Sequence, residues 1–124
     1  MADEASRREN FAKTLSLLDE AIVDAAPSRL MLAAAIKAFE MAYEQAWKFL
    51  KLQLAEAGYV VASPREVFRK AFQSQWIDDE ALWLAMIRDR NDTAHAYQEL
   101  VAREIFDNIR AKYARALSAF LHRR

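Results

Sequence analysis

Residues 29–57 read RLMLAAAIKAFEMAYEQAWKFLKLQLAEA and form the longest helical pattern in this chain. Large apolar side chains recur along the stretch at steps of three and four residues, which places them on one face of an α-helix. That face consists of Phe39, Tyr43, Trp47, Leu50 and Leu54. Gly58 follows and is a typical helix stop, because glycine readily adopts the left-handed conformation that ends many helices. The stretch predicts a long amphipathic helix from about Arg29 to Ala57.

The same period is present before this helix, from about Arg7 to Ala25. The apolar positions of that segment are Phe11, Leu15, Leu18 and Ile22, with charged residues between them. Pro27 cannot extend the first helix, and Ser28 can cap the second. We therefore predict two helices joined by a short turn.

A third, short helix is predicted after a loop at residues 59–62. Ser63 can cap it, Pro64 suits the first helical position, and Glu66 completes a capping box three residues after the serine. The helix is expected to end near residues 73–75. Its apolar side consists of Val67, Phe68, Ala71 and Phe72.

Two further helices complete the chain. The acids Asp78, Asp79 and Glu80 suit the positive end of a fourth helix. Its expected buried face consists of Leu82, Trp83, Met86 and Ile87. A last long helix reaches about Leu121, with an apolar stripe at Leu100, Ala102, Ile105, Ile109, Tyr113, Leu117 and Phe120. Strand signals are nearly absent, so we predict one all-α domain over residues 1–124, an antiparallel up-and-down helical bundle of about four long helices plus one short helix.

The composition excludes several classes of protein. The chain carries 18 basic and 18 acidic residues, which argues against a strongly basic protein that binds nucleic acid by general attraction to phosphate. Its single glycine excludes glycine-rich phosphate loops, and the absence of cysteine excludes disulfides and thiolate metal sites. We expect neither a metal nor a cofactor. With no apolar signal segment and no run long enough to span a membrane, we expect a soluble cytoplasmic protein.

The candidate site lies at residues 90–97, which read RNDTAHAY. On a continuous helix Arg90 and His95 would point about 140° apart, whereas Asn91 and His95 would share a face. Residues 91–93 are all good N-cap residues, so we expect a break there that turns the chain. The break would place Arg90 beside His95 in the first turn of the next helix, whose free N–H groups could bind an anion.

This pairing of side chains suits the cleavage of a phosphodiester. Arginine donates to phosphate oxygens, and histidine takes or gives a proton near neutral pH. Cleavage of RNA requires both a base and an acid, and a twofold dimer that brings two copies of Arg90 and His95 together would supply both without a metal. The alternative is an ordinary capping turn with a hydrogen-bonded His95 and a half-buried Tyr97.

The pattern of Arg90, Asn91, His95 and Tyr97, at the junction of the last two helices of a bundle, resembles the HEPN superfamily. Within it the chain looks like the nucleotidyltransferase substrate-binding branch, which includes HepT-like toxins. That resemblance extends from about residue 39 and includes Phe39-Glu40 with Tyr43, Trp47-Lys48, Leu50-Lys51, Ser63-Pro64-Arg65, Trp83, Arg88-Asp89-Arg90-Asn91 and His95-Ala96-Tyr97.

The resemblance implies a dimer, or a higher oligomer, that pairs with a separate minimal nucleotidyltransferase of the polymerase-β type. In toxin–antitoxin members the helical protein is a metal-independent ribonuclease, and the transferase blocks it by adding AMP to a tyrosine. Carried over to this sequence, Arg90 orients phosphate, His95 transfers protons, Asn91 positions them and Tyr97 is modified.

The same branch also has an older interpretation, in which the bundle only binds a nucleotide or other substrate for the transferase. Its contacts would be Arg90 and His95, with Tyr43 and Trp47 as a surface on which a base stacks. From the residues alone, Tyr43 and Trp47 are more typical of a core stripe. A purely structural dimer is a third class, and it would require none of Arg90, His95 or Tyr97.

Overall fold

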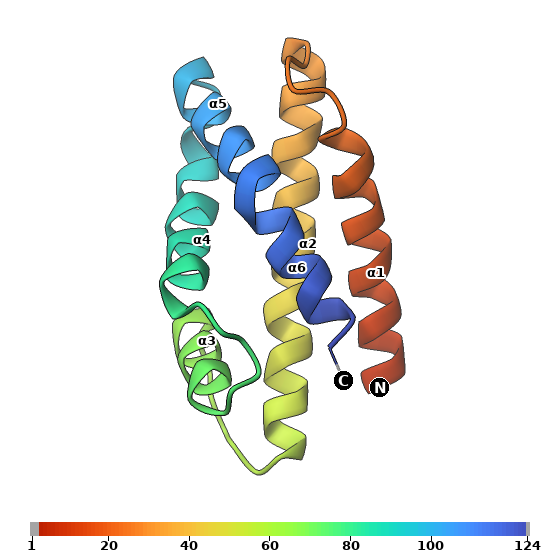
Figure 1. Cartoon of the computed structure of the whole chain (residues 1–124), viewed down its shortest axis with the longest axis vertical. Helices are drawn as coiled ribbons and strands as arrows, with labels where there is room; N and C mark the ends of the chain where they lie inside the picture. Colours follow the sequence, from red (N-terminus) through yellow and green to blue (C-terminus); the bar gives the residue numbers. More distant parts are fainter. Residues whose placement is uncertain (1–2, 124) are drawn as a thin grey trace.

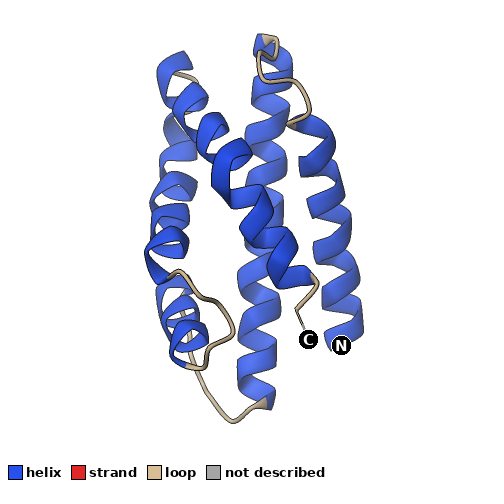
Figure 2. Cartoon of the chain, viewed as in Figure 1, coloured by secondary structure: helices blue, strands red, loops and turns tan. Residues whose placement is uncertain are grey.

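The computed structural model describes residues 3–123, and all regular structure in that range is helical (Figure 2). This confirms the predicted all-α class. No helix among these residues combines the length and the apolar character needed to cross a membrane. The elements are α1 (Glu4–Ala21), α2 (Arg29–Glu56), α3 (Pro64–Gln73), α4 (Glu80–Asp92), a 3-10 turn (Thr93–His95), α5 (Glu99–Asn108), a π-helical segment (Ile109–Tyr113) and α6 (Ala114–Leu121).

The helices form an antiparallel bundle in which α1 and α2 run in opposite directions (Figure 1). After the short α3, α4 runs in the direction of α1, and α5 with α6 returns along the bundle. Both ends of the described chain therefore lie at one end of the bundle, and the turn between α4 and α5 lies at the other (Figure 1). Four long helical stretches and one short helix match the expected architecture.

Local sequence signals set the ends of α2. The Ser28 hydroxyl accepts a hydrogen bond from the Met31 backbone N–H at 3.1 Å. At the other end Gly58 has a φ of +97°, and its neighbour Tyr59 donates its backbone N–H to the Leu54 carbonyl at 2.8 Å. This is the pattern of a helix closed by a left-handed glycine. The predicted helix and both of its end signals are confirmed.

The caps of the two following helices are also confirmed. Ser63 accepts from the backbone N–H of Glu66 at 3.3 Å, which is the first half of the predicted capping box, and the Glu66 carboxylate accepts from the Ser63 hydroxyl at 3.0 Å rather than from its backbone N–H. Asp79 accepts from the backbone N–H of Leu82 at 3.0 Å and is the N-cap of α4. Acidic side chains therefore occupy the positive end of both helices.

The core is aromatic and is centred on α2. The Phe39 ring stacks on Tyr113 from the last helix, with ring centroids 5.6 Å apart. The ring centroids of Phe11 in α1 and Phe49 in α2 lie 6.3 Å apart, and both rings are fully buried. The aromatic core therefore joins α1, α2 and the last helix.

The last helix differs from the prediction. It is not one continuous α-helix, because residues 109–113 form a π-helical segment. The buried residues Ile105, Ile109, Tyr113 and Leu117 are spaced by four, and each such step drifts by about 40° on an α-helix. The wider π turn absorbs this drift, so that both halves of the helix keep their apolar side in the core.

Three smaller predictions were wrong. Leu100 is 81% exposed, because it lies about 140° around the helix from the buried Ile105. Phe72 is 40% exposed in the last turn of α3, where the chain begins to turn away. Helix α1 begins at Glu4, after the N-cap Asp3, and ends at Ala21 rather than near Ala25.

Candidate functional site

The break after α4 falls within residues 91–93, as predicted, but the next helix does not begin there. Helix α4 continues to Asp92, and Thr93 begins a 3-10 turn that ends at His95. The hydroxyl of Thr93 donates to the backbone carbonyl of Arg90 at 2.7 Å, so this side chain competes with the helical hydrogen bonds and helps to end α4. His95 therefore lies in the 3-10 turn and not in the first turn of α5.

The expected anion site at the start of the next helix is also displaced. Helix α5 begins at Glu99, and its N-cap Gln98 makes no capping hydrogen bond through its side chain. Glu99 places a carboxylate in the first turn, where the helix dipole favours negative charge. The positive end of α5 is therefore partly neutralised by the chain itself and does not lie at His95.

The guanidinium of Arg90 faces α2. Its Nη1 lies 3.3 Å from a carboxylate oxygen of Glu40, and its Nε lies 3.8 Å from Glu44. Nη1 also donates to the Thr93 hydroxyl at 3.1 Å. The side chain of Arg90 is 29% exposed, so these contacts are partly shielded from water and are stronger than surface ion pairs.

His95 faces a different part of the fold. Its side chain lines a cleft of about 380 Å³ whose other lining residues are Asp89, Asp92, Gln98, Val101, Glu104 and Ile105. Arg90 does not line this cleft, and no hydrogen bond joins Arg90 to His95 within residues 3–123. Within one protomer, the expected pairing of the two side chains is therefore not present.

Asp89 is held in place beside this cleft. The same carboxylate oxygen of Asp89 accepts two hydrogen bonds, one from the Tyr113 hydroxyl at 2.6 Å and one from the Asn108 side-chain amide at 2.9 Å. Burial, and then the bond to Asp89, raises the pKa of the Tyr113 hydroxyl well above its usual value. These two hydrogen bonds join α4 to the last helix at Asp89, the residue before Arg90.

Tyr97 is 81% exposed, and its ring meets the His95 ring edge-on with centroids 6.4 Å apart. The half-buried tyrosine of the capping-turn alternative is therefore not observed. Asn91 is also exposed and lines a separate surface hollow beside Arg65. Tyr97 and His95 come together in the structure, whereas Asn91 lies apart from both clefts that these two residues line.

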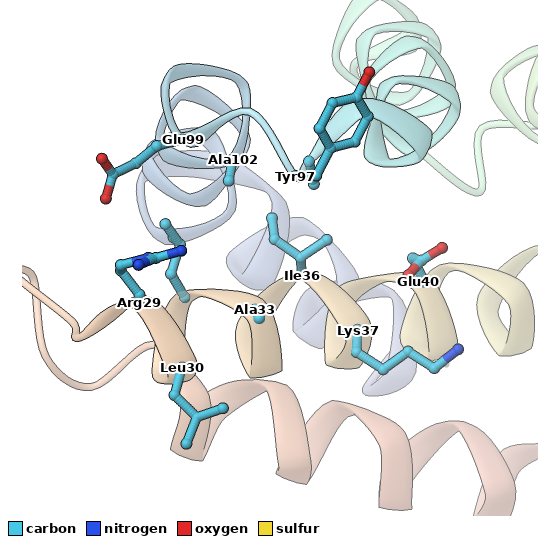
Figure 3. Close-up of a pocket in the computed structure, with 11 residues that line it drawn as sticks. Arg29, Leu30, Ala33, Ile36, Lys37, Glu40, Tyr97, Glu99 and Ala102 are labelled. Atoms are coloured by element: carbon cyan, nitrogen blue, oxygen red, sulfur yellow. The ribbon is translucent and has the colours of Figure 1, made fainter.

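Tyr97 stands at the edge of a larger cleft of about 700 Å³, between the first half of α2 and the start of α5 (Figure 3). Small and apolar side chains form much of its lining, and charged groups from both helices surround it. The lining residues are Arg29, Leu30, Leu32, Ala33, Ile36, Lys37, Glu40, Ala96, Tyr97, Glu99 and Ala102. The Tyr97 hydroxyl points away from α2 (Figure 3).

The two aromatic residues proposed for base stacking lie further along α2. Tyr43 is only 3% exposed, and its ring packs against Phe39 and edge-on against Phe68. Burial, and then the charge of Glu44, raises the pKa of Tyr43 to about 12. The stacking hypothesis is therefore wrong for Tyr43, because no face of its ring is open to a base.

Trp47 is partly buried and is held by hydrogen bonding. Its indole N–H donates to Glu44 at 3.0 Å, and the Lys51 ammonium lies 5.9 Å from the centre of its ring. Both contacts come from α2 itself. Trp47 therefore supports the position of Glu44 on the face that meets Arg90.

Sequence reasoning missed the contacts of Glu40, Glu44 and Thr93. Glu40 and Glu44 are four residues apart on α2, and this spacing places two acids on one helix face. That spacing is visible in the sequence. The spacing identifies the face and does not identify which element packs on it.

No group of three or more side chains suited to hold a metal ion occurs in the described part of the chain. The residues that line the clefts at this end, together with Arg90, offer a guanidinium, an imidazole, a phenol and several carboxylates.

Comparison with known proteins gives one family match. A family model described as "Nucleotidyltransferase substrate binding protein like" matches residues 6–124. A search of curated proteins found no match.

Two solved structures are similar to this chain. A protein from Thermus thermophilus shares 36% sequence identity, with 91% of this chain and 99% of that chain covered and a TM-score of 0.85. A protein from Haemophilus influenzae, described as revealing the fold of a substrate binding domain of a nucleotidyltransferase, shares 24% identity. That match covers 92% of this chain and 96% of the other, with a TM-score of 0.79, and it supports the fold alone.

Proposed function

Because this chain belongs to the nucleotidyltransferase substrate binding protein-like family, we propose that it is the helical partner of a separate minimal nucleotidyltransferase and acts as a metal-independent ribonuclease toxin. The family match confirms the branch inferred from the motifs. The observation that carries the proposal is the exposure of His95 and Tyr97, side by side, in one turn at the end of the bundle. The proposal places this activity in the cytoplasm.

The nuclease reaction is assigned to a homodimer, because one His95 per chain cannot supply both a base and an acid. A twofold axis through this end of the bundle would bring two copies of the exposed turn together. One imidazole removes the proton of the 2′-hydroxyl, whose oxygen then attacks the phosphorus. The other, protonated, gives its proton to the 5′-oxygen as the P–O bond breaks, which leaves a cyclic phosphate and a free 5′-hydroxyl.

Arg90 is assigned to the phosphate in this reaction. Within residues 3–123 Nη1 makes a hydrogen bond and Nε is buried, so the proposal assigns the Nη2 donors to a phosphate oxygen. Asn91 lies exposed at the end of α4 and is assigned to positioning the RNA strand.

Regulation is assigned to Tyr97. Its phenolic oxygen would attack the α-phosphorus of ATP in the transferase, with pyrophosphate as the leaving group and the phenolic proton passing to the transferase or water. The added nucleotide would carry bulk and negative charge beside His95, since the two rings lie 6.4 Å apart. Both effects oppose the approach of an RNA phosphate.

The nuclease proposal is tested with purified protein and with growth after expression of the chain alone. His95→Ala and Arg90→Ala are expected to abolish RNA cleavage and relieve growth arrest while the circular dichroism spectrum stays helical. His122→Ala is the matched control, because it removes the other, exposed histidine at the opposite end of the bundle. Absence of cleavage and of toxicity in the unaltered protein would reject the nuclease.

The modification is tested by intact-mass measurement after incubation with the transferase and ATP. The mass of one or more AMP groups is expected on the unaltered chain and is expected to be lost in Tyr97→Phe. Tyr59→Phe serves as the control, because Tyr59 is also exposed but lies at the far end of α2. An unchanged mass, or labelling that persists in Tyr97→Phe, would remove this role.

A second candidate function is a substrate-binding subunit that catalyses nothing. Two observations favour it: Arg90 is already paired with carboxylates, and the 700 Å³ cleft beside Tyr97 has the size of a small-molecule site with an apolar floor and charged edges. Calorimetric titration with nucleotides tests it. Binding that is lost in Lys37→Ala, in a protein that does not cleave RNA, would favour this function.

A further inference from the structure

A small network joins α2 to the turn that carries the candidate site. The Thr93 hydroxyl accepts from Nη1 of Arg90 at 3.1 Å and lies 3.2 Å from a carboxylate oxygen of Glu40. The same Glu40 oxygen lies 3.3 Å from Nη1 of Arg90. Three polar groups therefore meet within hydrogen-bond or ion-pair distance, and two of them come from the end of α4 and one from the middle of α2.

Thr93 is the only buried polar residue among those the structure describes. A buried hydroxyl is costly unless it is hydrogen-bonded, and this one both accepts and donates. Its single hydrogen has two acceptors within reach, the Arg90 carbonyl at 2.7 Å and Glu40 at 3.2 Å. Thr93 is thus tied to α4 and α2 at the point where the 3-10 turn begins.

The place of this network in the sequence gives it consequences for the site. His95 is two residues after Thr93 and closes the same 3-10 turn. The turn is continued by hydrogen bonds from Ala96 to Thr93 and from Gln98 to His95, at 3.1 and 3.0 Å. A rigid attachment of Thr93 to α2 therefore limits where the His95 and Tyr97 side chains can lie.

Glu40 also orients the guanidinium. Glu40 lies 3.3 Å from Nη1, and Glu44 lies 3.8 Å from Nε, which is buried and makes no hydrogen bond, so two carboxylates on one face of α2 attract the Arg90 side chain toward that helix. Glu44 is held in turn by the Trp47 indole. Neither acid lies at the exposed turn itself, so they act on the site through Arg90.

We propose that Glu40 and Thr93 are positioning residues of the ribonuclease, which hold the Arg90 guanidinium and the 3-10 turn bearing His95 in one fixed arrangement on α2. The inference rests on the proposed nuclease function. Neither residue touches RNA. Loss of either residue makes Arg90 and the turn more mobile. This lowers kcat, the rate of the chemical step, more than it weakens RNA binding, because RNA binding is spread over many contacts.

The test uses three variants of the full chain. Thr93→Val keeps the branched shape and removes the hydroxyl, Thr93→Ser keeps the hydroxyl, and Glu40→Gln keeps the size and removes the charge. Two matched controls are Thr14→Val, whose hydroxyl bonds within α1, and Glu56→Gln, at the exposed end of α2.

Thr93→Val and Glu40→Gln are expected to lower kcat for RNA cleavage by about tenfold to a hundredfold, with KM within roughly threefold, because small misplacements of catalytic groups have effects of this size. Thr93→Ser is expected to restore most of kcat, and the controls are expected to match the unaltered chain. Hydrogen exchange of the Arg90 Nε–H, followed by nitrogen-15 NMR, is expected to be slow in the unaltered chain and faster in the two disabling variants.

The outcomes separate this inference from the nuclease proposal. If the unaltered chain cleaves RNA and both disabling variants keep its kcat, the positioning role is overturned and the nuclease stands. If kcat falls but Thr93→Ser does not restore it and Arg90 exchange is unchanged, the role is overturned as well. If the unaltered chain does not cleave RNA while its Arg90 exchanges slowly, the nuclease fails and the catalytic positioning role falls with it.

Discussion

Replacement of Tyr113 by phenylalanine tests the network beside the candidate site. The change removes one oxygen, which donates to Asp89 at 2.6 Å, and leaves the ring that stacks on Phe39. Asp89 keeps its bond from the Asn108 amide. A hydrogen bond to a charged group contributes roughly 1.5–3 kcal/mol, so Tyr113→Phe is expected to lower the free energy of unfolding by ~2 kcal/mol. For a chain of this length that corresponds to a fall in Tm of roughly 6–10 °C.

The effect also has a defined pH dependence. The pKa of Tyr113 is raised in the folded state by burial first and then by the bond to Asp89, so folding favours the neutral hydroxyl. The stability that this group contributes is fully present below the pKa of an unfolded tyrosine, about 10, and is lost as the pH rises toward the folded-state value. The difference in unfolding free energy between the unaltered chain and Tyr113→Phe is therefore expected to be constant from pH 7 to pH 9 and to shrink above pH ~10.

Urea denaturation followed by circular dichroism measures both effects. Tyr59→Phe is the matched control, because its ring is 40% exposed and its loss of a hydroxyl is expected to change the unfolding free energy by less than about 0.5 kcal/mol. A loss below about 0.5 kcal/mol in Tyr113→Phe would refute the reasoning. A difference between the two proteins that stayed constant through the alkaline range would refute the pH argument.

Three further predictions concern the ends and faces of helices, each measured by chemical denaturation. Ser63→Ala is expected to lower stability by ~1 kcal/mol through loss of the α3 cap, and rescue by Asp at that position would identify the cap as the cause. Gly58→Ala is expected to lower stability by ~1 kcal/mol because Gly58 has a positive φ of +97°. Gln75→Gly is expected to raise stability by ~0.5 kcal/mol because Gln75 has a φ of +64°. A gain in stability from Gly58→Ala, or a loss from Gln75→Gly, would contradict the backbone argument. Leu100→Ser is expected to change stability by less than about 0.5 kcal/mol, while Ile105→Ser is expected to lower it by at least ~2 kcal/mol, and equal effects would contradict the exposure of Leu100.

Helix positions were predictable because the chemistry that sets them is local. The period of Phe39, Tyr43, Trp47 and Leu50 identifies a helix without reference to any other part of the chain. Gly58 ends that helix through the conformation of its own backbone. These signals were sufficient for the number, order and approximate limits of the helices.

The geometry of the candidate site was less predictable because it depends on tertiary contacts. The sequence placed a break after Arg90, but it gave no sign that the guanidinium turns toward Glu40 on a helix fifty residues earlier in the chain. Thr93 was expected only as one of three capping residues, whereas its hydroxyl also contacts α2. The exposure of Tyr97, in contrast to the burial of Tyr43, likewise depends on which helices pack over each ring.

The π-helical segment at residues 109–113 divides the last helix into two parts that have different tasks. The α5 part packs on α2 near the exposed turn, and the α6 part packs on α1 near the chain ends. If the same residues formed an unbroken α-helix, α6 would be rotated by about 100° relative to α5, because the π turn accommodates one extra residue. Leu117 and Phe120 would then point away from the core, whereas α5 would keep its place beside the candidate site. The π turn therefore sets the rotation of α6 relative to α5, so that each half of the helix can keep its own packing.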